Sequence, residues 1–340
     1  MARGARSTSD IQRTLEERIV REGVPSSGVR LWPDYARLIS SRGSGERTAT
    51  EFMVLRSAGP GPPHRTRMLV EVKIYSNFSR PGVGLKPRQE SQRPLLPQHS
   101  RHCPVLEAGN ALGFLVHPPL NENEAFYVEY RGDGRYEFKY FMSNASGAWG
   151  PIFSVTWTLP IGSIGMMREE VLFASPDTGV TEDGALRMAR AFVVPEDFGT
   201  PPGAITLRGA YNFKTPTGWD SVYTPVLNLV DRPIAPMLVV RVETDWYAHQ
   251  TEFRYVLQPG EGLPGSHNLP IGQVHFVPRE EVELVECKQK DLEEIRRMRD
   301  EFSKAKAAHK TTTRFGLEFS PHYARESRAR REEANKEKAD

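Results

Sequence analysis

The sequence predicts a mainly β protein: a jelly-roll or cupin-like β-sandwich or barrel, with an N-terminal helix-strand arm and a long C-terminal helix. Two observations predict the β class. From about residue 105, short apolar and aromatic runs recur between turn residues, which is typical of antiparallel sheets. The stretch RGDG, residues 131–134, separates two alternating runs, and Asp-Gly is a strong β-hairpin signal. We therefore predict a β core over residues 105–285.

Residues 1–104 predict an arm and a linker before that core. Apolar residues recur at four-residue spacing within residues 9–23, which predicts a short amphipathic helix. Residues 67–78 alternate like a strand, and residues 79–104 are rich in Pro, Gly and Arg without periodicity. Such a composition favours a loop or linker.

The core is predicted from strand-like runs in order along the chain. In residues 151–160, Phe153, Val155 and Trp157 alternate with smaller residues, so one face of that strand would be apolar. Further runs over residues 204–213, 235–246 and 249–260 extend the series.

Residues 286–340 predict a helix and a charged tail. The stretch 290–310 carries Leu292, Ile295, Phe302 and Ala305 at helical spacing, a narrow stripe that suits packing on the β core or on a second subunit. After Tyr323 the chain mixes Arg, Lys and Glu without core-forming residues. This pattern indicates a frayed helix or a disordered tail.

Charge and cysteine content narrow the function classes. The net charge of the 340-residue chain is only +2, which does not favour nucleic acid as a partner, so the basic loops rank last among candidate sites. Its two cysteines are far apart and form no C-x-x-C pair, which fits a reducing cytoplasm. No apolar run approaches membrane-spanning length, so we expect a cytoplasmic protein.

The first candidate site is the stretch VETDWYAHQ, residues 242–250, with Glu243, Asp245 and His249. On a strand, Glu243 and Asp245 would point the same way. Their mutual repulsion would then raise the pKa of one carboxyl and prepare it for proton transfer, so we assign them as candidate catalytic residues. The alternative is that they cap a turn and that His249 is solvated.

The second candidate is a metal site. The stretch PIGQVHF, residues 270–276, matches the P-x-G-x-x-H part of a cupin metal motif, although no His-x-His precedes it. His275 and His249 are the candidate ligands, for a divalent metal such as iron or zinc. The alternative for His275 is a strand histidine with a satisfied hydrogen bond.

Trp219 and Trp246 are candidate walls of a ligand pocket whose polar end would hold Glu243 and Asp245, since pockets are mostly apolar with few polar groups. Trp219 follows Pro216 and Gly218 in TPTGW, residues that favour a turn. The alternative is a turn in the core.

Four stretches, HCPVLEAGNALGFLVHPP, FGTPPGAITLRGAYNFKTPTGW, VETDW and LPIGQVHFVPRE, resemble in order the landmarks of a bacterial family described as domain of unknown function 6065. The resemblance covers about residues 102–305, with Phe114 where the family pattern has Trp. It implies a common fold but no reaction. It adds Asn110 to the candidate ligand-binding residues and gives weight to the Glu-Thr-Asp-Trp stretch. The matching positions are Asn110, Ala111, Gly113, Phe198, Gly199, Thr215, Pro216, Gly218, Trp219, Glu243, Thr244, Asp245 and Trp246.

A weaker likeness concerns dUTPase-like β proteins, through Asp245, Tyr247, Gly272 and Gln273. Their Ser-containing phosphate motif is absent from this sequence, so the likeness implies only a β-rich architecture.

Two functions remain open at this point. The first is a small-molecule-binding protein or enzyme of secondary metabolism, which could depend on a metal. The second is a structural or assembly protein that forms homo-oligomers through its C-terminal helix without catalysis. The clustered acids and tryptophans favour the first, and the lack of a complete catalytic motif favours the second.

Overall fold

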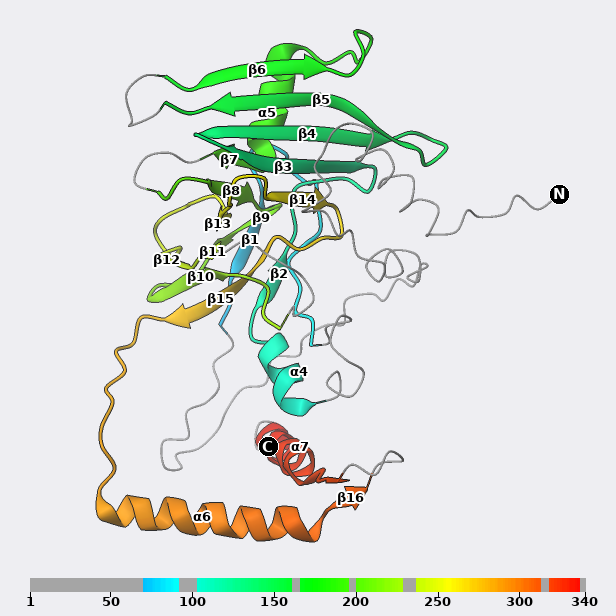
Figure 1. Ribbon diagram of the computed structural model, residues 1–340. Helices are drawn as coiled ribbons and strands as arrows, with labels where there is room; N and C mark the ends of the chain where they lie inside the picture. Colours follow the sequence, from blue (N-terminus) through cyan, green and yellow to red (C-terminus); the bar gives the residue numbers. More distant parts are fainter. Residues whose placement is uncertain are drawn as a thin grey trace, which may run out of the picture. The chain divides into compact units, whose positions relative to one another are not determined.

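The structure, a computed structural model, describes residues 70–91, 103–160, 166–195, 200–228, 237–312 and 318–336 (Figure 1). The described chain divides into two units, which we name the β unit, ending at Arg279, and the C-terminal unit, beginning at Glu280. The predicted N-terminal helix lies outside the described residues.

The largest sheet of the β unit has five strands in the order β14-β3-β4-β5-β6. Asp133 and Gly134 take φ values of 51° and 71° in the turn between β3 and β4, so the predicted hairpin is confirmed. All the strand pairs of this sheet are antiparallel. The strands are β3 (Glu124–Gly132), β4 (Arg135–Ser143), β5 (Trp149–Thr158), β6 (Arg168–Phe173) and β14 (Gly262–Ser266).

Two four-stranded sheets complete most of the β unit, in the orders β12-β10-β15-β2 and β11-β13-β8-β7. A two-stranded sheet pairs β1 (Lys73–Ser76) with β9 (Tyr211–Lys214). The β unit thus begins before residue 105, where the predicted core starts. The remaining strands are β2 (Phe114–Val116), β7 (Val193–Pro195), β8 (Ala204–Arg208), β10 (Trp219–Thr224), β11 (Met237–Leu238), β12 (Val240–Val242), β13 (Glu252–Val256) and β15 (Gly272–Pro278).

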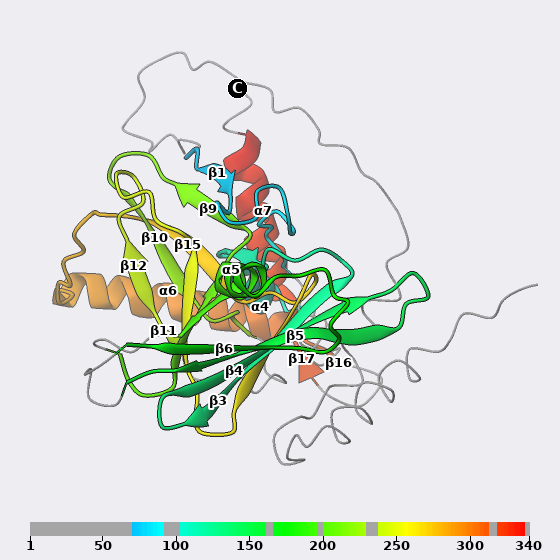
Figure 2. The same cartoon turned by 90° about the horizontal axis from the view of Figure 1, so that it is seen from above.

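The core lies on one face of the five-stranded sheet. As predicted, Phe153, Val155 and Trp157 share the buried face of β5, with exposures of 2% or less. Helix α5 (Glu182–Phe192), which Thr181 caps, lies against this face (Figures 1 and 2). Its last residue, Phe192, is fully buried and stacks on aromatic rings of β3 and β4. The amphipathic helix is thereby anchored by aromatic packing.

A short helix, α4 (Pro104–Asn110), precedes β2. It starts at a proline, which suits the first turn of a helix because that turn leaves backbone N–H groups unused.

The C-terminal unit contains helix α6 (Gln289–Ala308), a short β16–β17 pair (Thr311–Thr312 with Glu318–Phe319) and helix α7 (His322–Lys336). The charged segment after Tyr323 is therefore helical as far as Lys336. Among the described residues, no helix is both long and apolar enough to cross a membrane.

The mainly β class is confirmed, since antiparallel sheets form the β unit. The local reasons agree with the sequence: alternating residues build the strands, and Gly or Asp-Gly forms the turns.

Candidate functional site

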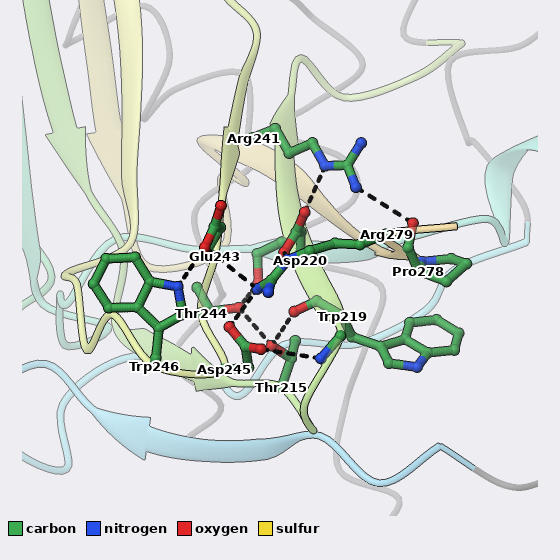
Figure 3. Close-up of polar contacts among 12 residues, drawn as sticks. Thr215, Trp219, Asp220, Arg241, Glu243, Thr244, Asp245, Trp246, Pro278 and Arg279 are labelled. Carbon is green, nitrogen blue, oxygen red and sulfur yellow. Dashed lines mark hydrogen bonds and ion pairs between the residues drawn. The ribbon is translucent and has the colours of Figure 1, made fainter. Parts of the chain in front are cut away.

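Four charged residues, Asp220, Arg241, Asp245 and Arg279, form an ion-pair cluster where β10 begins and where β12 and β15 end (Figure 3). Asp220 is 2% exposed and accepts hydrogen bonds from Arg241 Nε at 2.6 Å and Arg279 Nε at 2.5 Å. Arg279 also donates through Nη2 to Asp245. One arginine thus joins two carboxylates, and hydrogen bonds between charged groups are stronger than neutral ones.

The backbone places these side chains. Asp220 on β10 pairs with Val277 on β15. Arg279 comes just after the end of β15, which places its side chain close to Asp220. Gly218 takes a φ of +80°, which side chains rarely adopt. Its N–H donates to Asp245 Oδ2 at 3.0 Å, and its carbonyl accepts from the Arg279 N–H at 2.9 Å.

The two stretches that carry the family resemblance here, Thr-Pro-x-Gly-Trp and Glu-Thr-Asp-Trp, meet at this cluster. Thr244 is 2% exposed, and its hydroxyl lies 3.0 Å from the Thr215 hydroxyl and 2.8 Å from the Ser221 hydroxyl. Thr215 in turn donates to the Trp219 carbonyl at 2.6 Å. These buried bonds fix the turn after β12 against the start of β10.

Glu243 and Asp245 follow the alternative interpretation, a turn, and the raised pKa predicted for one of the two carboxyls is not found at Asp245. Both lie in a turn and not on a strand, since the Tyr247 N–H bonds the Glu243 carbonyl at 3.0 Å. The hydrogen bond from Arg279 holds the pKa of Asp245 below its ordinary value, and the Gly218 N–H acts in the same direction. An ionised carboxylate held by an arginine is a poor proton donor or acceptor near neutral pH.

Glu243 and Trp246 lie at the surface of the same turn. The Glu243 side chain is 51% exposed, with its carboxylate 3.8 Å from Arg279 Nη2, and it accepts a hydrogen bond from the Trp246 indole N–H. Trp246 is 69% exposed. Its ring is the first of a row that continues through Tyr247 and His249, with centroids 5.7 and 5.1 Å apart. We name residues 243–249 the aromatic turn.

Trp219 and Trp246 lie on opposite sides of the ion-pair cluster in Figure 3. Trp219 is partly buried. The two indoles therefore do not face each other as walls of one pocket.

Asn110 is 1% exposed and holds α4 in place. Its side chain donates to the Ser91 carbonyl at 2.8 Å and accepts from Asn228 at 2.9 Å. Its carbonyl accepts from Gln273 at 3.3 Å. These contacts explain the burial of a polar side chain, because each polar atom has a protein partner.

The two candidate metal ligands bond different neighbours. His249 Nδ1 lies 2.5 Å from the Gln250 carbonyl, and its Nε2 lies 3.8 Å from Glu252. His275 Nε2 lies 3.1 Å from the Thr224 hydroxyl, and burial lowers its pKa. Within the described residues, no three His, Cys, Asp or Glu side chains are grouped so as to hold a metal ion. The metal site stays a prediction.

Sequence reasoning missed the other three members of the cluster, Asp220, Arg241 and Arg279, of which Arg279 bonds Asp245. Arg279 follows Pro278 at a strand end, and Asp220 follows Trp219. A charge next to a buried strand is a weak signal, because most such charges face solvent.

No protein-family model matches this chain, and no curated protein matches it significantly. The resemblance described above therefore stays a prediction.

Proposed function

We propose that the β unit is a binding module without catalysis that holds a partner protein through the aromatic turn. The observation that supports this most directly is Trp246, a large apolar side chain left 69% exposed on a turn that partly buried ion pairs and buried hydroxyls fix. Tyr247 beside it is 47% exposed. Trp, Tyr and Arg dominate the residues that contribute most to protein–protein affinity.

The rigidity of the turn supports binding as well. The side-chain hydrogen bonds of Asp245 and Thr244 hold its backbone in place, so little conformational freedom is lost when a partner covers it. Covering the exposed part of the indole would contribute roughly 3 kcal/mol, from the area of such a ring and the usual free energy of apolar burial.

The surroundings suit a protein surface. Arg241 is 52% exposed in its side chain, and Leu238 and Val239 nearby in the chain are 38% and 60% exposed. Apolar residues rimmed by charges are typical of interaction sites.

The enzyme hypothesis loses its acid–base argument at Asp245, whose pKa is lowered, and we do not propose a reaction. The small-molecule and metal hypotheses stay predictions, as do a jelly-roll or cupin-like barrel and a cytoplasmic location. Metal analysis of protein purified without chelator tests one of them. About one equivalent of iron or zinc, lost in His249→Ala or His275→Ala, would favour a metal enzyme over the binding module.

The direct test places a photo-cross-linking amino acid at position 247 in cells, beside an intact Trp246, with Ser146 in the exposed β4–β5 turn as the control position. We expect a discrete adduct from position 247 only. The captured protein is then purified and its affinity measured by calorimetry. Trp246→Ala should weaken binding at least tenfold, whereas Ser146→Ala should not. Equal affinity of both variants, or no adduct at position 247, would refute the proposal.

A further inference from the structure

Helix α6 has an unusual surface for a 20-residue helix: none of its residues is buried. Ile295, Met298 and Phe302 remain 46%, 52% and 39% exposed. It runs without a break in Figure 1, where it is orange. Helices in water are stabilised mainly by packing an apolar face, and within the part of the chain that the structure describes this apolar stripe lacks the cover that such a helix normally has.

Among its described side chains, helix α7 covers one end of the stripe. The ring of His322, its first residue, lies 5.0 Å from Phe302 and 5.4 Å from His309. The next residue of α7, Tyr323, is 48% exposed. The sequence of α7 is dominated by Arg and Glu, so it offers few apolar residues to Ile295 or Met298.

The stripe follows a heptad repeat. With Ile295 and Phe302 at position a, Met298 and Ala305 fall at position d. Apolar residues at a and d form the seam of a coiled coil, and on α6 such a seam extends over two heptads.

The positions beside this seam carry opposite charges. Position g holds Glu294 and Glu301, and position e holds Arg299 and Lys306. Among the described residues, one of these four forms an ion pair: Glu301 lies 3.9 Å from Arg297, and both side chains are about 70% exposed. An exposed pair of this length is weak.

We propose that α6 pairs in parallel with α6 of a second copy of this chain. In a parallel coiled coil, position g of one helix faces the position e five residues later in the other. Glu294 then faces Arg299 of the second copy, and Glu301 faces Lys306. Two-fold symmetry repeats both pairs. In an antiparallel arrangement, g would face g and e would face e, which would oppose like charges.

Two heptads bury less area than a standard interface, so the pair is weak, with a dissociation constant on the order of 10 μM. Such a dimer would assemble only where the chain is concentrated. It would also present two aromatic turns per assembly, but it does not depend on the function proposed for them.

The test uses sedimentation equilibrium of the full chain from 1 to 200 μM in low salt. We expect a monomer–dimer equilibrium for the wild type. Two charge-reversal variants, Glu294→Lys with Glu301→Lys and Arg299→Glu with Lys306→Glu, should each weaken dimerisation at least tenfold. A mixture of the two should form heterodimers, because every g–e pair becomes complementary again. Circular dichroism serves as the folding control, and Lys290→Glu, outside the seam, serves as the matched control.

Orientation is tested by Ala305→Cys in a chain whose two native cysteines are replaced by serine. Mild oxidation should link the copies through position 305 in a parallel pair. A monomer at all concentrations, reversal variants that dimerise like the wild type, or a dimer that does not cross-link at position 305 would each overturn the proposal.

Discussion

His117, which follows β2, is 1% exposed, and neither of its ring nitrogens has a hydrogen-bond partner among the residues that the structure describes. Burial lowers its pKa to about 3, and the nearby charges of Arg88 and His267 act in the same direction. The folded β unit therefore holds a neutral imidazole where the unfolded chain would bind a proton below pH 6.5.

This burial predicts acid sensitivity. Because the pKa of His117 is lower in the folded state, its contribution to stability is complete above pH 6.5 and declines as the pH falls toward 3. Between pH 7.5 and 5 the free energy of unfolding should decrease by about 2 kcal/mol. Urea unfolding at both pH values measures it. In His117→Leu the decrease should be smaller by that amount, and an equal decrease in both proteins would contradict the prediction.

Asp220 and Glu243 both lie close to Arg279, but their substitution should affect stability differently. Asp220 is 2% exposed and bound by two arginines, whereas the Glu243 side chain is 51% exposed. We expect Asp220→Ala to lower the free energy of unfolding by about 2 kcal/mol, since it removes two charged hydrogen bonds. Glu243→Ala should change it by less than about 0.5 kcal/mol. Denaturant unfolding of both variants measures these free energies. Similar losses of stability would contradict the role given to Asp220.

At the scale of the elements, Gly203 determines how the chain enters β8. It has a φ of +86°, and a Cβ atom there would lie 2.0 Å from the Leu257 carbonyl oxygen. That carbonyl belongs to the backbone after β13, and the Leu257 N–H donates to the Gly203 carbonyl at 2.9 Å. The close approach joins β8 to β13 at the end of their pairing.

Gly203→Ala is therefore predicted to be much more harmful than Gly179→Ala. Gly179 has a similar φ of +67°, but a Cβ atom there meets nothing within 4 Å. We expect a loss of about 1 kcal/mol at Gly179, from the backbone conformation alone, and of at least about 3 kcal/mol at Gly203, where the backbone must also shift. Thermal unfolding compares the two, and equal losses would show that the contact with Leu257 is relieved without strain.

The elements were predicted where a local pattern determines them. The Asp133-Gly134 turn and the alternation of Phe153, Val155 and Trp157 need only neighbours in sequence. The sequence left a strand and a turn open for the aromatic turn, because its conformation depends on Arg279 and Gly218, which lie far away in sequence. Propensity does not carry information about such partners.

For the whole molecule, the division at Arg279 predicts that the β unit folds without the C-terminal unit. A chain ending at Val285 should unfold within about 2 °C of the full chain's β-unit transition, since the truncation keeps the ion-pair cluster. Arg279→Ala in the same truncated chain should lower the midpoint by about 6 °C. Calorimetry measures both. Loss of cooperative unfolding on truncation alone would contradict the division.

The β class of the molecule was predictable from the recurrence of short apolar runs, whereas the pairing of the sheets was not. β1 pairs with β9 across more than half of the β unit's length, and β2 joins β15. Both pairings join segments distant in sequence, and single-sequence patterns do not determine register between them. The candidate site shows the same limit: the sequence pointed to Asp245 but not to Arg279, the distant residue that bonds it.

Arg279 has one more consequence, which concerns proteases. Trypsin must draw an arginine or lysine side chain into its own pocket before it cuts, and the Arg279 guanidinium is tied to Asp220 and Asp245. The residues that follow are exposed through Lys288 and Lys290. A brief trypsin digestion of the folded chain should therefore leave the bond after Arg279 intact and cut after Lys288 and Lys290 instead.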